Sequence, residues 1–212
     1  MSDKQLETNK ICEKLWQISG SDWVAVKFEK EIIANDIEPV RFCEAVCKSQ
    51  KEPISLSFSN ICCDGAKRCF GWLKNSDMKL AQRFSEKTGI SQDIAFKLIR
   101  SVPVLTEKFS GVSLSKDIDG DVYITYTSPE SAMKLVRSWQ AITECNLDTE
   151  ISGIMSVCGN VAVKSYIDQK ISISFGCPDS RKYGGITKEQ LVIGLPHKVA
   201  WHICVVNDSR EL

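Results

Sequence analysis

The chain has 212 residues, 43% of them hydrophobic and 25% charged, and its 27 basic residues balance its 27 acidic ones. This composition is typical of a globular protein long enough to bury a core of its own. A net charge of zero provides no broad basic field, so nucleic acid and anionic membranes are not expected partners. Cysteine is the residue type that stands out, with 10 copies.

The ends of the chain and its apolar runs bear on the compartment. Charges interrupt residues 1–10 throughout, and no apolar run approaches the roughly 20 residues of a membrane span. We therefore expect a cytoplasmic protein, in which thiols stay reduced. Ten reduced thiols are then either buried as small hydrophobic side chains or used for metal binding or chemistry.

The first half of the chain predicts helices and strands in mixed order. Apolar spacing predicts helices over 3–19, 42–50 and 77–87, and strands over 23–28 and 54–58. Ser91 is placed to cap one more helix. The apolar stripe of that helix is Ile94, Ala95, Leu98, Ile99 and Val102.

The second half begins with a hairpin pattern. Strands around Val112 and Val122 flank a turn through Asp119-Gly120. A helix follows from Pro129 to about Thr143, with Ser128 as its cap. Further strands are expected over 161–163, 171–175 and 191–195. Because helices and strands do not alternate regularly, we expect a single α+β domain over 1–212 with a mixed or antiparallel sheet.

Two stretches of the chain resemble each other. Each contains Cys, a Lys-Ser pair, a strand of the form Ile-Ser-[Leu/Ile]-Ser-Phe, and Cys again. Cys43 and Cys158 differ by 115 positions, as do Cys62 and Cys177, and the two strands, which begin at Ile54 and Ile171, differ by 117. These offsets predict an internal duplication with a pseudo-two-fold axis, whose halves span about 22–110 and about 111–204.

A pseudo-two-fold arrangement would bring equivalent cysteines together. Cys43 with Cys62 or Cys63 would come from one half, and Cys158 with Cys177 from the other. Four thiols suit a tetrahedral metal or a cubane cluster. No Cys-x2-Cys pair is present, so neither a zinc ribbon nor a bacterial ferredoxin pattern fits.

The loop after the first strand of the repeat has further features of a cluster site. Gly65 and Gly71 could let backbone N–H groups approach sulfur, as occurs around iron–sulfur clusters. Lys67, Arg68 and Arg181 could lower the pKa of nearby thiols. We take Gly65, Gly71 and Arg181 as candidate cofactor-binding residues.

Six short motifs, in order, resemble the uncharacterised prokaryotic family called domain of unknown function 169. They are Trp23-Val-Ala-Val-Lys27, Arg41-Phe-Cys43, Cys63-Asp-Gly-Ala66 through Gly71, Ser128-Pro-Glu-Ser-Ala-Met133, Ser174-Phe-Gly-Cys177 with Arg181, and Val192-Ile-Gly-Leu-Pro196. The resemblance covers about 12–204 and implies an origin in anaerobic archaea or bacteria. It implies no activity. Its motif cysteines fall on Cys43, Cys63, Cys158 and Cys177, and the adjacent Cys62 leaves the second assignment open.

These observations favour a cytoplasmic iron–sulfur protein of anaerobic metabolism, with a 4Fe-4S cluster or, alternatively, zinc held between the half-repeats. The expected metal ligands are Cys43, Cys62, Cys63, Cys158 and Cys177. Electron transfer and sulfur or small-molecule chemistry both fit such a site, so the expected partners are a redox protein or a small substrate, with a homodimer left open. Two alternatives remain: a metal-free enzyme with one activated cysteine, and a small-molecule or partner-binding module with buried structural thiols.

Overall fold

The computed structural model describes residues 10–33 and 35–208. Within them, six strands form one antiparallel sheet in the order β2-β3-β1-β4-β6-β5. The strands are β1 (Trp23–Glu29), β2 (Ile54–Ser57), β3 (Gly111–Ser115), β4 (Val122–Thr127), β5 (Ser172–Ser174) and β6 (Leu191–Pro196). The α+β class expected from the sequence is confirmed.

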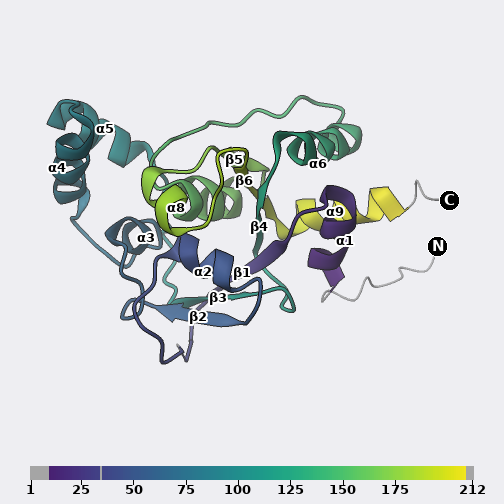
Figure 1. Ribbon diagram of the computed structural model, residues 1–212, viewed down its shortest axis with the longest axis horizontal. Coiled ribbons are helices and arrows are strands. Elements are labelled where there is room, and N and C mark those ends of the chain that lie inside the picture. Colours follow the sequence, from purple (N-terminus) through teal and green to yellow (C-terminus); the bar gives the residue numbers. More distant parts are fainter. Residues whose placement is uncertain (1–9, 34, 209–212) are drawn as a thin grey trace.

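Helices cover both faces of the sheet (Figure 1). On one face lie α1 (Ile11–Ser19), α6 (Pro129–Thr143) and α9 (His197–Asp208), which pack against one another. The other face carries α2 (Phe42–Lys48), α3 (Asp64–Cys69), the π-helix η2 (Ser156–Val163), α7 (Lys164–Asp168) and α8 (Pro178–Tyr183). A helical hairpin of α4 (Asp77–Thr88) and α5 (Gln92–Ser101) stands beside α3 and α8 at the edge of the molecule.

Strand β1 shows how the sequence divides the core into two layers. Successive side chains of a strand point to opposite faces. Trp23 and Ala25 therefore join the core under α1, α6 and α9, whereas Val24 and Val26 join the core under α2, α3 and η2. The indole N–H of Trp23 donates to Ser19 Oγ at 2.9 Å, which satisfies its polar atom inside the first core.

Several predicted elements are confirmed at their expected positions. Ser128 Oγ accepts a hydrogen bond from Ser131 N at 3.2 Å and caps α6, and Ser91 caps α5 in the same way. The α5 stripe is only partly core, because Ile94 and Leu98 are 52% and 41% exposed. The helix predicted over 3–19 is present from Ile11, with Lys10 directly before it, and residues 3–9 lie outside the described ranges. No helix in 10–33 or 35–208 is long and apolar enough to cross a membrane.

The hairpin predicted around Asp119-Gly120 is wrong. Strands β3 and β4 do not pair with each other, because β1 lies between them and is antiparallel to both. The connection passes close to β1, where a side chain at Gly120 would come within 3.0 Å of Val26 N. A strand distant in sequence has displaced the local partner, which the turn pattern alone does not reveal.

The strand predicted over 161–163 is also wrong, because these residues end the π-helix η2. All eight residues of η2 are buried, so its apolar run lacks the alternation that separates helix from strand. The sequence analysis also treated α3 as loop and did not predict α7, α8 or α9. Two of these, α3 and α8, begin directly after Cys63 and Cys177.

The strand order has an internal symmetry. Exchanging β1 with β4, β2 with β5 and β3 with β6 gives the same order read from the other edge of the sheet. The central pair β1–β4 is antiparallel. This is the pattern of a two-fold axis normal to the sheet between β1 and β4. The internal duplication remains a proposal, and the strand order favours a boundary after β3 rather than near residue 110.

The residue alignment of the two repeat strands is wrong. Ile54 and Leu56 of β2 face the core under α2 and α3, as expected. In β5, however, Ser172 and Ser174 are buried and Ile173 packs toward the opposite core. A two-fold axis normal to the sheet keeps equivalent residues on the same face of the sheet. The offset of 117 pairs residues that lie on opposite faces, so the two strands are not equivalent residue by residue at that offset. The terminal phenylalanines of both copies, Phe58 and Phe175, are half exposed.

Candidate functional site

Six of the ten cysteines lie on the sheet face that α2, α3, η2 and α8 cover. They are Cys43, Cys47, Cys63, Cys69, Cys158 and Cys177. Cys12 and Cys204 are buried in the opposite core, and Cys62 and Cys145 are exposed. The fold therefore gathers thiols from four separate segments on one side of the molecule.

Cys43 is the second residue of α2 and is buried against α8. A side chain at Gly184, directly after α8, would lie 3.0 Å from Cys43 Cβ, so glycine allows the two helices to approach. Beneath Cys43, the buried Tyr126 of β4 donates from its hydroxyl to the carbonyl of Cys43 at 2.8 Å. These contacts fix where α2 begins relative to the sheet.

Adjacent Cys62 and Cys63 have different surroundings. Cys62 is exposed, whereas Cys63 packs against the core and directly precedes α3. Burial raises the pKa of Cys63, while hydrogen bonds from the backbone N–H groups of Ala66 and Gly65 oppose the rise. The structure thus brings Cys63 into the thiol group and leaves Cys62 at its margin.

The thiols act on one another electrostatically. The pKa of Cys43 is raised to about 12, first by burial and then by negative charge on Cys177 and Cys63. The pKa of Cys158 lies well above its usual range, first because Cys158 is hydrogen-bonded to Cys69 and then because it is buried. Charge on Cys63 and Cys177 acts in the same direction on Cys158. Cys43 and Cys158 are therefore neutral thiols at neutral pH in the absence of a metal.

Of the three predicted cofactor-binding residues, Gly65 borders the thiols, whereas Gly71 and Arg181 make other contacts. Gly65 borders the site, because a side chain there would meet Met155 Cγ at 3.3 Å and Cys63 Sγ at 3.7 Å. Gly71 has a left-handed backbone and turns the chain beside the carbonyl of Leu105. Arg181 donates to the carbonyls of Phe175, Thr187 and Gln190, so its guanidinium organises that loop.

The basic residues expected to influence the thiols also have other partners. Arg68 is buried, and its Nε lies 2.6 Å from Asp77 Oδ1. Lys67 lies over the ring of Phe58. The cation that does interact with Cys63 and Cys62 is Arg41, which the sequence analysis did not select.

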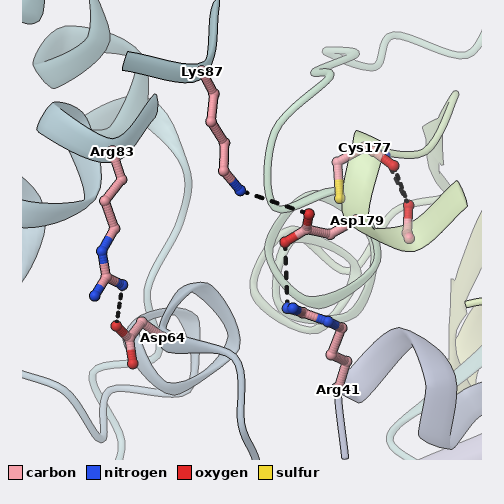
Figure 2. A network of polar contacts seen from close by, with 7 residues as sticks. Arg41, Asp64, Arg83, Lys87, Cys177 and Asp179 are labelled. Carbon is pink, nitrogen blue, oxygen red and sulfur yellow. Dashed lines mark hydrogen bonds and ion pairs between the residues drawn. The ribbon is translucent and has the colours of Figure 1, made fainter. Parts of the chain in front are cut away.

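A network of charged side chains lies at the surface beside the thiols (Figure 2). Arg41 Nη1 is 3.3 Å from Asp179 Oδ2 and also stacks on the ring of Tyr183. From α4, Lys87 reaches Asp179 at 3.9 Å and Arg83 reaches Asp64 at 2.6 Å. These pairs connect α4 with α8 and α3, on which Cys177 and Cys63 lie.

Within the described ranges, no three His, Cys, Asp or Glu side chains are grouped as a single metal ion requires. The convergence of Cys43, Cys63, Cys158 and Cys177 around one point therefore stays a prediction. Sequence reasoning missed two sulfurs of the region, because neither Cys69 nor Met155 was among the expected ligands. Met155 lies three residues before Cys158, and this short spacing was the available signal.

Comparison with known proteins shows to which family the chain belongs. The family model for domain of unknown function 169, described as uncharacterised ArCR, matches residues 21–204. The chain belongs to this family. The matched region of this domain 169 protein includes all six strands and all the thiols of the site.

One relative with a curated sequence is uncharacterized protein MJ0308 of Methanocaldococcus jannaschii. It is 25% identical over 211 residues, covering 90% of this domain 169 chain and 91% of the relative. No solved structure matches the chain.

Proposed function

We propose that this protein binds an iron–sulfur cluster through Cys43, Cys63, Cys158 and Cys177, between the two symmetric parts of its sheet. The observation that carries the proposal is that these thiols, from α2, the start of α3, η2 and the start of α8, lie on one face of the sheet. Cys63 and Cys177 both act electrostatically on Cys43 and on Cys158. Thiolate sulfur is the ligand of iron–sulfur clusters and also suits zinc, which is the alternative metal.

The pKa values of the thiols favour a metal over an activated nucleophile. The thiolate is the reactive form of cysteine, and a catalytic cysteine requires a lowered pKa. Burial instead raises the pKa of Cys43 and Cys63. Metal ions overcome this cost, because their positive charge displaces the thiol proton. A metal-free thiol enzyme is therefore the weaker of the two chemical proposals.

The chemistry proposed for the cluster is electron transfer or the binding of a sulfur compound or other small molecule at iron. Backbone N–H groups of Gly65 and Ala66 point toward Cys63, and such hydrogen bonds help to set the potential of a cluster. Arg41 would provide positive charge beside Cys63, and the network around Asp179 offers a polar surface to a redox partner. We place this activity in the cytoplasm of an anaerobe.

The test is purification without oxygen followed by absorbance, iron and sulfide measurements on matched variants. Cys63→Ser and Cys177→Ser should lose the brown colour and the bound iron. Cys62→Ser is the neighbouring control, and Cys12→Ser controls for loss of a buried thiol from the other core. Both controls should keep the colour.

Two results would contradict the proposal. Wild-type protein without metal would favour a binding module with buried structural thiols. Loss of colour in Cys62→Ser and retention in Cys63→Ser would show that the proposed ligand set is wrong.

A further inference from the structure

Met155 brings a thioether into contact with the buried thiols. Its backbone is left-handed, with φ 44° and ψ 42°, a conformation uncommon for a residue with a long side chain. From this position, directly before η2, its Sδ accepts a hydrogen bond from Cys69 Sγ at 3.5 Å. The strained conformation therefore directs one soft ligand atom onto another.

Cys158 adds a third sulfur. It interacts with Cys69, whose sulfur contacts Met155, so two thiols and a thioether lie in one group. The next residue is Gly159, where a side chain would lie 2.9 Å from Cys69 Sγ and 2.4 Å from Val102 Cγ1. Glycine at this position leaves the space that Cys69 occupies.

The spacing of these sulfurs suits one metal ion. Two sulfur atoms 3.5 Å apart can both lie about 2.3 Å from an ion, at an S–metal–S angle of about 100°. A mixture of thiolate and thioether ligands is soft and selects Cu(I) over harder cations. Cys69 and Cys158 are buried, whereas Met155 is half-buried and gives the site a side toward solvent.

We propose that Cys69, Cys158 and Met155 bind a single Cu(I) ion when the protein contains no other metal. Each thiol that binds releases its proton to solvent, no electron is transferred, and the thioether binds without losing a proton. Cys158 also belongs to the proposed iron–sulfur ligand set. Cu(I) and the cluster would therefore exclude each other, although Cu(I) binding itself does not require the cluster proposal to be right.

The experiment is an oxygen-free titration of metal-free protein with Cu(I), in competition with a chromophoric Cu(I) chelator. Wild-type protein should show one tightest equivalent. Met155→Leu keeps a side chain of similar size and should weaken this equivalent about 10-fold or more, and Cys69→Ser should weaken it further. Cys47→Ser removes another thiol of the same sheet face, which belongs to neither proposed site, and should leave the tightest equivalent unchanged.

Two outcomes would overturn the proposal. One is equal affinity in the wild type, Met155→Leu and Cys69→Ser. The other is equal loss in Cys47→Ser and Cys69→Ser, which would indicate binding by any group of thiols. If Cys69→Ser does not fold, the Cu(I) affinity of Met155→Leu alone tests the proposal. A negative Cu(I) result would not affect the iron and sulfide measurements, so the two proposals can be tested separately.

Discussion

At the scale of single residues, burial without a counter-charge dominates the behaviour of the thiols. Cys12, Cys43 and Cys204 each have a pKa raised to about 12, in every case mainly because the group is buried. Cys12 and Cys204 lie in one core and Cys43 in the other, so this is a property of the fold as well as of the site. The raised pKa values of these thiols make the stability of the metal-free protein depend on pH.

Whether stability rises or falls with pH depends on which state, folded or unfolded, binds the thiol protons more tightly. The folded protein holds these thiol protons more tightly than the unfolded chain, whose thiols keep the ordinary value of 9.0. The resulting stability is complete below that pH and is lost as the pH rises toward about 12. The urea midpoint of the metal-free protein should therefore fall between about pH 8 and about pH 10. Cys204→Ala should show a smaller fall, and exposed Cys145→Ala should match the wild type. Identical profiles for all three proteins would contradict this account.

At the scale of elements, α6 shows how reliably local patterns predict a helix. Ser128 and Pro129 correctly predict where it starts. Leu135 is fully buried, whereas Val136 and Trp139 are only half-buried. The helix covers the core opposite to the thiols.

Leu135→Ala should lower the free energy of unfolding by about 2–5 kcal/mol, because it leaves a cavity under α6. Metal binding should not change, since the thiols lie across the sheet. Met133→Ala, on the exposed side of the same helix, is the control and should cost little. Equal stability of the two variants in urea unfolding would show that Leu135 is not a core residue.

The π-helix η2 behaves differently, because its packing depends on one residue without a side chain. Gly159→Ala should destabilise the protein by about 1–3 kcal/mol, since the new methyl group would overlap Val102 and the sulfur of Cys69. Gly153 has open space around its Cα, so Gly153→Ala is the matched control and should have a small effect. The comparison is again made by urea unfolding, and a stable Gly159→Ala would contradict the close packing of η2 on α3.

At the scale of the whole molecule, the sequence predicts the fold class and most elements but not how distant segments meet. The turn at Asp119-Gly120 suggests a hairpin, yet β1 separates the two strands. The buried run ending at Val163 has no periodicity to separate helix from strand. Pairing partners and complete burial are properties of the assembled sheet, which local patterns do not encode.

The candidate site also has features that the sequence predicts and features that only the assembled fold determines. Cysteine spacing and the duplication point to Cys43, Cys158 and Cys177, which the structure places on one sheet face. The distinction between Cys62 and Cys63 depends on how α3 packs, and the approach of Met155 to Cys69 depends on one left-handed residue. The short spacing between Met155 and Cys158 is the one sequence signal for the second feature, and the first has none. The symmetric strand order is likewise visible only in the sheet.

The most direct test of the central claim is the iron and acid-labile sulfide content of the wild-type chain purified without oxygen. The account predicts bound iron and sulfide in comparable amounts, with the broad visible absorbance of an iron–sulfur cluster. Zinc without sulfide would contradict the iron assignment. A colourless, metal-free chain whose ten cysteines all react as free thiols after unfolding would contradict the thiolate–metal account as a whole.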